Sequence, residues 1–306
     1  MGVSNLQVRL GRLVLANPVM TAGGAVGYGR EYTPVTDLSQ AGAMVVKTLT
    51  LTPRSGNPPP RVAETPAGMV HAIGLPNEGV ESFVIEILPR LRLFAVPIIA
   101  SIGGETIAEY QAVARKLARA EGIAGIEINL SCPDAEYGRA EFGLDSERVA
   151  QLISAVRSET DLPLIAKLSP NAGDLVPIAE AAVAAGAEGL CLTNSPWGLA
   201  VDVRTRRFRL SAGVGGLSGP AIKPIALYHV WRIHRAMPHV PLIGVGGIAT
   251  WEDALEFLLV GASAVQIGTA HYLQPKVVSE VVEGLRAYAM AHAVENLATL
   301  IGSVQA

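Results

Sequence analysis

Eight short apolar runs recur along the chain, and most of them are separated by a segment with helical periodicity. Near-continuous hydrophobic runs, in contrast to alternating ones, are typical of parallel strands that are buried on both faces. The pattern therefore predicts eight buried strands, at Pro18–Thr21, Met44–Thr48, Pro97–Ser101, Gly125–Leu130, Pro163–Leu168, Gly189–Thr193, Leu242–Val245 and Ala264–Gly268.

The segments between the runs carry apolar residues at the spacing of an amphipathic helix, as in Ile107–Ala120, Arg148–Val156 and Asp253–Leu259. Eight strand–helix units in one chain favour a closed (β/α)₈ barrel. Because such barrels of about 250 residues fold as one unit, residues 1–306 are predicted to form a single domain. The alternative is a doubly wound open sheet.

Three segments are additional to the eight strand–helix units of a minimal barrel. Leu6–Val8 and Leu13–Leu15 are predicted to form a hairpin that closes the barrel bottom. Thr52–Asn77 is rich in Pro and Gly without a periodic pattern, which predicts an irregular loop, whereas Trp197–Gly215 is predicted to contain a second hairpin. Both long insertions follow strands, so we expect them to lie over the C-terminal face, where barrel active sites are found.

The composition narrows the class of protein. Mean hydropathy is +0.36, but no apolar stretch reaches the length of about 18 residues that a membrane span requires, so the hydrophobicity belongs to buried strands. The net charge of −3, without blocks of like charge, argues against nucleic-acid or membrane surfaces. Two cysteines cannot form a disulfide framework, and no secretory signal is visible, so a cytoplasmic location is expected.

Polar residues stand at the ends of the predicted strands. A single strand-terminal lysine is usually an ordinary surface residue, but several polar side chains at one rim of a barrel predict an active site. The polar residues that end the second, fourth, fifth and sixth runs are Lys47, Asn129, Cys132, Lys167, Thr193, Asn194 and Ser195.

Glycine turns end the last two strands, at Gly246-Gly247 and Gly268-Thr269, and Gly215–Gly219 is a third glycine-rich segment. Glycine lets backbone N–H groups approach a ligand, and a following helix favours an anion. Together they predict a phosphorylated cofactor, although each alone could be an ordinary tight turn. No GxGxxG motif follows the first strand, so a nicotinamide is not expected.

Cys132 and Cys191 differ in context. Cys191 lies inside an apolar run and is predicted to be a small buried hydrophobe. Cys132 precedes Pro133 at a strand exit, which suits a nucleophile or a general base. No histidine lies nearby in sequence to complete a hydrolase dyad, and the histidines lack metal-ligand spacing, so no metal site is predicted.

Three motifs resemble those of the dihydroorotate dehydrogenases: Asn129–Pro133, Ala166–Asn171 and Gly216–Pro224. The similarity runs from Asn17-Pro18 to Gly268-Thr269, nearly the whole chain. Within that family, Asn57–Glu64 with Ala72–Leu75, and Phe142-Gly143, most resemble the class 1B catalytic subunit.

The resemblance implies an FMN-containing barrel that oxidises (S)-dihydroorotate to orotate in pyrimidine biosynthesis. Cys132 would be the base that removes the C5 proton while C6 passes a hydride to flavin N5. Lys167 would stabilise the anionic reduced flavin near N1–O2. The implied substrate-binding residues are Lys47, His71, Ala72, Ile73, Gly74, Leu75, Asn129, Asn194 and Ser195.

The resemblance also implies a cofactor-binding set, which overlaps with the substrate-binding one. The glycines among them would cradle the flavin and its phosphate. The set comprises Ala22, Gly23, Lys47, Thr48, Ser101, Asn129, Lys167, Thr193, Gly219, Gly246, Gly247, Gly268 and Thr269.

The chain departs from the family pattern at four positions. His71 and Asp134 stand where the family usually has Asn, Ser101 replaces an Asn, and Gly23 replaces a Ser. A carboxylate only accepts hydrogen bonds, so Asp134 facing an anionic substrate would repel it. Asp134 would then either pair with His71 or point to solvent. A His71–Asp134 pair would raise the histidine pKa and keep the imidazolium charged near neutral pH.

The resemblance further implies a homodimer and an electron-transfer subunit with FAD and a 2Fe–2S cluster that passes electrons to NAD. The chain has too few cysteines to hold such a cluster itself. Two other functions remain open: a related FMN dehydrogenase of another dihydropyrimidine such as dihydrouracil, and a catalytically idle barrel that serves as a binding subunit.

Overall fold

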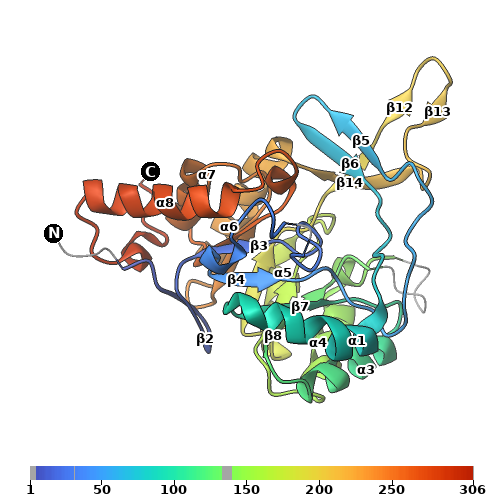
Figure 1. The fold of residues 1–306 in the computed structure, drawn as a ribbon, viewed down its shortest axis with the longest axis horizontal. Helices are drawn as coiled ribbons and strands as arrows, with labels where there is room; N and C mark the ends of the chain where they lie inside the picture. Colours follow the sequence, from blue (N-terminus) through green and yellow to red (C-terminus); the bar gives the residue numbers. More distant parts are fainter. Residues whose placement is uncertain (1–4, 31, 133–139, 306) are drawn as a thin grey trace.

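The computed structural model describes residues 5–30, 32–132 and 140–305, and it contains a closed eight-stranded barrel (Figure 1). The strands pair in parallel in the order β10-β15-β16-β3-β4-β7-β8-β9. All eight predicted runs are strands, which confirms the barrel and rules out an open sheet. The strands are β3 (Val19–Thr21), β4 (Ala43–Val45), β7 (Ile98–Ile102), β8 (Ile123–Asn129), β9 (Leu164–Lys167), β10 (Gly189–Leu192), β15 (Leu242–Val245) and β16 (Ala264–Ile267).

Helices surround the barrel and follow the predicted periodicity. The three predicted helices are present, each with ends within two residues of the expected ones: α3 (Ile107–Ala118), α4 (Ser146–Arg157) and α7 (Trp251–Leu259). Thr106, Asp145 and Thr250 cap their N-termini with side-chain oxygens. The other α-helices are α1 (Gly79–Ser82), α2 (Leu88–Leu91), α5 (Leu175–Ala184), α6 (Lys223–Ala236) and α8 (Val277–Ala291).

Short helical turns complete the helix inventory of the described residues. A π-helical turn lies between α1 and α2, and the rest are 3-10 turns. They are η1 (Leu38–Gln40), η2 (Phe83–Ile87, the π-helical turn), η3 (Arg92–Phe94), η4 (Phe142–Leu144), η5 (Pro220–Ile222), η6 (Thr269–Tyr272) and η7 (Leu297–Leu300).

The barrel and its helices form two hydrophobic cores, and a third, small cluster of Ala63, Val70 and Leu210 lies in the two insertions. Of the two cores, one lies between the strands and the helices, and the other fills the barrel. The predicted N-terminal hairpin is present as β1 (Val8–Leu10) and β2 (Leu13–Leu15), and its buried face belongs to the interior core. Arg12 in its turn donates hydrogen bonds to both Glu188 carboxylate oxygens, each at 2.9 Å or less, so the hairpin is held against the barrel.

The segment Thr52–Asn77 is not irregular, which corrects the prediction. It forms β5 (Val62–Thr65) and β6 (Gly68–His71), and β6 pairs with β14 (Val214–Ser218) from the second insertion. With β11 (Trp197–Leu199) they make an antiparallel sheet in the order β11-β14-β6-β5. The two insertions are therefore one substructure, and the Gly215–Gly219 segment is largely strand rather than turn.

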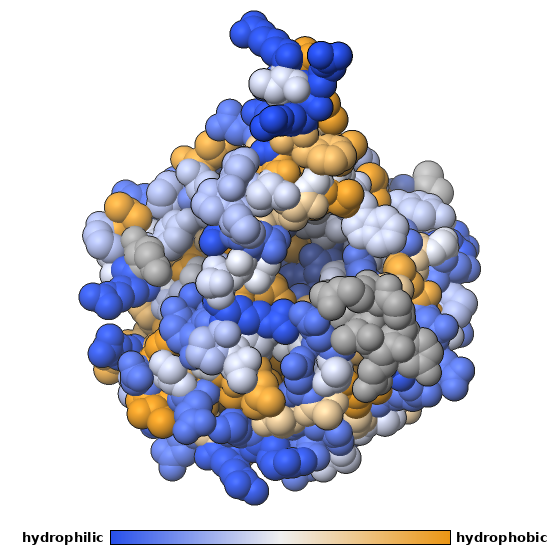
Figure 2. Space-filling model, turned by 90° about the vertical axis from the view of Figure 1, so that its right-hand side faces the viewer, coloured by the Kyte–Doolittle hydropathy of each residue, from blue (hydrophilic) through white to orange (hydrophobic). Residues whose placement is uncertain are grey.

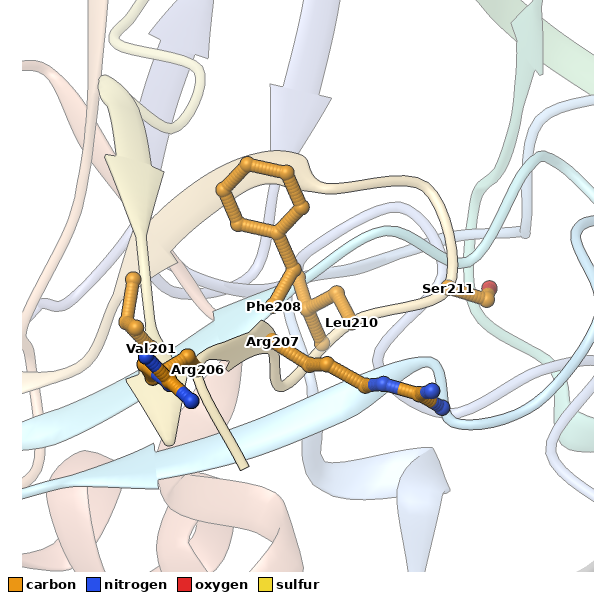
Figure 3. Close-up of a pocket in the computed structure, with 6 residues that line it drawn as sticks. All are labelled: Val201, Arg206, Arg207, Phe208, Leu210 and Ser211. Carbon is orange, nitrogen blue, oxygen red and sulfur yellow. The ribbon is translucent and has the colours of Figure 1, made fainter. Parts of the chain in front are cut away.

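The second insertion also contains the predicted hairpin, as β12 (Val201–Asp202) and β13 (Arg207–Phe208). It projects from the molecule in Figure 1, and in Figure 2 it is the hydrophilic knob above a face that is hollowed near its centre. A pocket of about 430 Å³ lies at this hairpin, lined by Val201, Arg206, Arg207, Phe208, Leu210 and Ser211 (Figure 3). None of these residues is a candidate for catalysis. No helix among the described residues is long and apolar enough to cross a membrane.

Candidate active site

Cys132 follows β8 and is buried, with 3% of its surface exposed. A Cβ atom placed on Gly103 would lie 3.0 Å from its Sγ, 2.8 Å from Thr48 Cγ2 and 3.5 Å from Leu75 Cδ1. Three predicted site residues thus converge on one point, and only a glycine leaves room there. Gly103 was not predicted, because a glycine between strand and helix is an ordinary turn signal.

Burial raises the pKa of the Cys132 thiol, and hydrogen bonds with Tyr110 and the Gly104 backbone only partly oppose this shift. Tyr110 is itself buried in α3, and its hydroxyl donates to the Asn129 carbonyl oxygen at 2.6 Å. Its ring packs edge-on against Phe142 at a centroid distance of 5.6 Å. Cys132 is therefore mainly a neutral thiol near pH 7, held by groups that favour its thiolate.

Four predicted substrate-binding residues form one hydrogen-bonded chain. Asn194 Nδ2 donates to Asn129 Oδ1 at 2.9 Å, and the Ser195 N–H donates to Asn194 Oδ1 at 2.9 Å. The chain ends where Ser195 Oγ lies 3.3 Å from His71 Nε2. It links the ends of two barrel strands to β6 of the inserted sheet.

Burial lowers the pKa of His71, opposite in direction to the raised pKa that a His71–Asp134 pair would give. The imidazole is therefore neutral near pH 7 and contacts Ser195 as a hydrogen-bonding group. Asp134, the proposed partner, lies outside the described residues. Ala72–Leu75 follow His71, and the Asn57 side chain donates to the Ala72 carbonyl at 3.0 Å.

Lys47 lies just beyond β4, and its ammonium forms an ion pair with Glu78. Its Nζ is 3.1 Å from Glu78 Oε2 and 4.3 Å from the centroid of the Tyr28 ring. Burial would raise the pKa of Glu78, but hydrogen bonds with Tyr28 and Lys47 outweigh it and lower the pKa. Glu78 was not predicted, since it directly precedes the short helix α1, which the hydrophobic pattern did not predict. Glu78 and Tyr28 therefore orient the Lys47 ammonium before any anion binds to it.

Backbone groups from three loops meet where the phosphate was expected. A Cβ on Gly247 would lie 3.0 Å from the Gly219 carbonyl oxygen, and one on Gly219 would lie 3.6 Å from Thr269 Cγ2. Within the described part of the chain, the N–H groups of Gly246, Gly247, Gly268 and Thr269 donate to no acceptor. A cluster of unpaired N–H groups suits a phosphate.

A helix after each glycine turn was expected to favour an anion, and the structure differs from that expectation. After Gly246-Gly247, helix α7 begins only at Trp251, and Thr250 and Asp253 already cap its N-terminus in a capping box. Gly268-Thr269 leads into η6, a single short turn. The N–H groups themselves, and not a helix dipole, are therefore the feature that suits an anion here.

Lys167 lies inside the barrel with two unpredicted partners. Its Nζ is 3.2 Å from Gln266 Oε1 and 3.5 Å from Glu127 Oε1, and Gln266 Nε2 donates to Glu127 Oε2 at 2.5 Å. Burial would lower the pKa of Lys167, but Glu127 outweighs it and raises the pKa. Glu127 is two residues before Asn129, and Gln266 is two before Gly268. Strand periodicity of two therefore places them on the interior face, a signal that the sequence contained.

The remaining predicted cofactor residues surround this interior group. Thr48 Oγ1 lies 2.9 Å from Ser101 Oγ. A Cβ on Gly23 would lie 3.4 Å from Glu127 Oε1 and 3.5 Å from Ser101 Cβ. The Thr193 N–H donates to the Val245 carbonyl at 3.1 Å, while Ala22 N–H donates to the Ile267 carbonyl at 2.8 Å. These contacts bring the predicted residues to one end of the barrel.

Comparisons with known proteins agree with this arrangement. Residues 5–288 match the dihydroorotate dehydrogenase family. A protein of Desulforudis audaxviator (strain MP104C), named dihydroorotate dehydrogenase B (NAD(+)), catalytic subunit, is 48% identical over 296 residues, 97% of this chain and 96% of that protein. A protein of the same name from Geotalea daltonii is 46% identical over 305 residues, 100% of both chains. This chain belongs to the dihydroorotate dehydrogenase family of oxidoreductases.

Proposed function

We propose that the chain oxidises (S)-dihydroorotate to orotate with bound FMN, as a step of pyrimidine biosynthesis. The observation that carries this proposal is the convergence of Cys132 with Thr48 and Leu75 on Gly103, beside the Asn129–Asn194 hydrogen bond. Full-length similarity to proteins named dihydroorotate dehydrogenase B (NAD(+)), catalytic subunit, supports the choice of substrate.

The residues fit a flavin mononucleotide. The unpaired N–H groups of Gly246, Gly247, Gly268 and Thr269 form a cradle for one phosphate, and a Cβ on Gly247 would lie 2.8 Å from Lys223 Cβ, so this loop tolerates only glycine. Lys167 would lie near the flavin N1–O2 edge. When bound, FMN supplies the acceptor for the hydride that leaves C6 of the substrate.

Cys132 is proposed to remove the proton from C5 of the substrate. Its thiolate accepts that proton at Sγ, and Tyr110 and the Gly104 N–H favour the charged form. Cys132 is 3% exposed, so bulk water has little access to its thiol.

Two kinds of group are proposed to recognise the substrate: a charged lysine and the amides of two asparagines. Lys47, oriented by Glu78, attracts the carboxylate. The amides of Asn129 and Asn194 present donors and acceptors to the pyrimidine edge, and their mutual hydrogen bond at 2.9 Å fixes which atoms face it. His71 and Ser195 extend this polar chain to the inserted sheet.

We propose that electrons leave through a partner subunit with FAD and a 2Fe–2S cluster and reach NAD. The name of the relatives, which includes both NAD(+) and "catalytic subunit", supports this proposal. The chain has only Cys132 and Cys191, so it cannot supply the thiolates of such a cluster. A homodimer of the catalytic chain is part of the same proposal.

The test uses the purified chain and its cofactor. Heat release of the flavin should yield FMN, and anaerobic dihydroorotate should bleach it faster than dihydrouracil. Faster bleaching by dihydrouracil would select the alternative substrate, and finding FAD or no flavin would overturn the proposal. A flavin that no dihydropyrimidine reduces would support the idle-barrel alternative.

A further inference from the structure

The barrel interior contains a group of three buried polar side chains that the mechanism above does not use in full. Lys167, Glu127 and Gln266 contact one another at 3.2, 3.5 and 2.5 Å, so each member touches both others. Glu127 and Gln266 are fully buried, and Lys167 is 8% exposed. We refer to these three residues as the interior triad.

A fully buried carboxylate is costly to keep unless something compensates it. Within the described residues, Glu127 has its ammonium partner in Lys167, and the Gln266 amide donates to its second oxygen. The same amide accepts from Lys167 through its oxygen, so Gln266 holds both charges in one geometry.

Glu127 also reaches the region proposed for the cofactor. Its Oε1 lies 3.4 Å from the position of a Cβ on Gly23, and Ser101 Cβ lies 3.5 Å from the same point. A side chain at position 23 would crowd the carboxylate, whereas glycine leaves space beside it. The carboxylate therefore lies beside Gly23 and Ser101, two of the residues proposed to bind the cofactor.

We propose that Glu127, held by Gln266, is a positioning residue that balances the charge of Lys167 and so lowers the electron affinity of the flavin. This inference rests on the proposed function, because it assumes that FMN lies against Lys167. An uncompensated ammonium would stabilise negative charge on the flavin strongly, while the paired ammonium does so weakly. The triad thus keeps the flavin reducing enough to pass its electrons on.

The test measures sulfite affinity, because sulfite forms a bond to flavin N5 with its sulfur lone pair and leaves the negative charge at N1–O2. Glu127→Gln removes a buried negative charge without changing shape. We expect it to tighten sulfite binding at least about tenfold, or about 1.4 kcal/mol, and to raise the flavin midpoint potential. Glu127→Asp, which keeps the charge, should stay near the wild-type affinity.

Two further variants keep the proposal testable if Glu127→Gln does not fold. Lys167→Gln should weaken sulfite binding, and Glu127→Gln with Lys167→Gln, which removes both charges together, should lie within about threefold of wild type. Replacing both members of a buried ion pair is often neutral for stability. Equal sulfite affinity in wild type and Lys167→Gln, or a double variant as weak as Lys167→Gln, would overturn the proposal.

The two proposals fail in distinguishable ways. If the purified chain carries no FMN, the proposed function fails before the triad is tested. If dihydroorotate reduces the flavin but Glu127→Gln leaves sulfite affinity and midpoint potential unchanged, only the inference about the triad fails.

Discussion

The two cysteines occupy two contrasting regions of the same barrel. Both thiols are buried, and burial raises the pKa of each. Cys132 lies at the rim, where Tyr110 and the Gly104 N–H hydrogen-bond it. Cys191 lies in β10 within the interior core, where the Lys167 charge favours its thiolate and Glu127 opposes it.

The contrast shows that burial alone does not identify a catalytic thiol. Reactivity needs neighbours that favour the thiolate and a reacting atom within reach. Both thiols have a neighbour that favours the thiolate, so the proposed substrate site at the rim is what would distinguish Cys132. Cys132 faces Thr48 and Leu75 across Gly103, whereas Cys191 lies in the interior core and hydrogen-bonds Glu127 there. The interior instead offers the fixed charges of Lys167 and Glu127, which would act on the proposed cofactor through space.

The largest expected effect distinguishes these two regions. Cys132→Ala should slow flavin reduction by dihydroorotate at least about a hundredfold, the lower end of a general-base contribution, with FMN still bound. The matched control, Cys191→Ala, should leave the rate within a few fold and lower Tm, because it removes a buried sulfur from the interior core. Stopped-flow anaerobic reduction and a thermal melt measure both, and a fast Cys132→Ala enzyme would disprove the assignment.

The pH dependence gives the next largest effect. Because the pKa of Cys132 is raised, the reduction rate should still increase above the ordinary thiol value of about 8.5. Tyr110→Phe removes a hydrogen bond that lowers the pKa, so its profile should shift to higher pH and its rate near pH 7 should fall about tenfold. An unshifted profile in Tyr110→Phe would show that the hydroxyl acts only on Asn129.

Much of the fold could be predicted from the sequence because it depends on local periodicity. The eight strands and helices α3, α4 and α7 each have their own hydrophobic pattern. The sheet formed by β5, β6, β11 and β14 could not be predicted, since β6 pairs with a strand about 145 residues later. Such pairing depends on tertiary contacts and not on the pattern of either segment.

The site residues also differ in whether local sequence patterns could predict them. Residues at strand ends, such as Lys47, Asn129 and Lys167, are predictable because parallel strands of a barrel end at one rim. Glu127 and Gln266 were also accessible through strand periodicity, but they were read as part of apolar runs. The partner Glu78, which directly precedes α1, could not be foreseen, because only the tertiary structure brings its carboxylate to Lys47.

Lys47→Gln addresses substrate choice at the rim. Without the ammonium, the carboxylate of dihydroorotate loses its cation, so KM should increase about tenfold or more, with a smaller change in kcat. Dihydrouracil lacks that carboxylate, and its much slower reduction should change less than twofold. Equal losses with both substrates would mean that Lys47 serves the flavin and not the carboxylate. Glu78→Gln is the control that keeps Lys47 while removing its ion pair.

The smallest expected effect concerns His71, at the boundary between barrel and inserted sheet. Since burial lowers its pKa, the imidazole is neutral near pH 7 and hydrogen-bonds Ser195 at 3.3 Å. An Asn side chain can both donate and accept, as a neutral imidazole can. His71→Asn combined with Asp134→Asn should therefore leave dihydroorotate turnover within about tenfold, or about 1.4 kcal/mol.

Anaerobic flavin reduction by dihydroorotate and by dihydrouracil, in wild type and in this double variant, measures the effect. The single variant His71→Asn isolates the described contact from the change at position 134. We expect dihydroorotate to be the faster substrate in each protein. A gain of several orders of magnitude on dihydroorotate in the double variant would instead mean that these two residues adapt the pocket to another dihydropyrimidine.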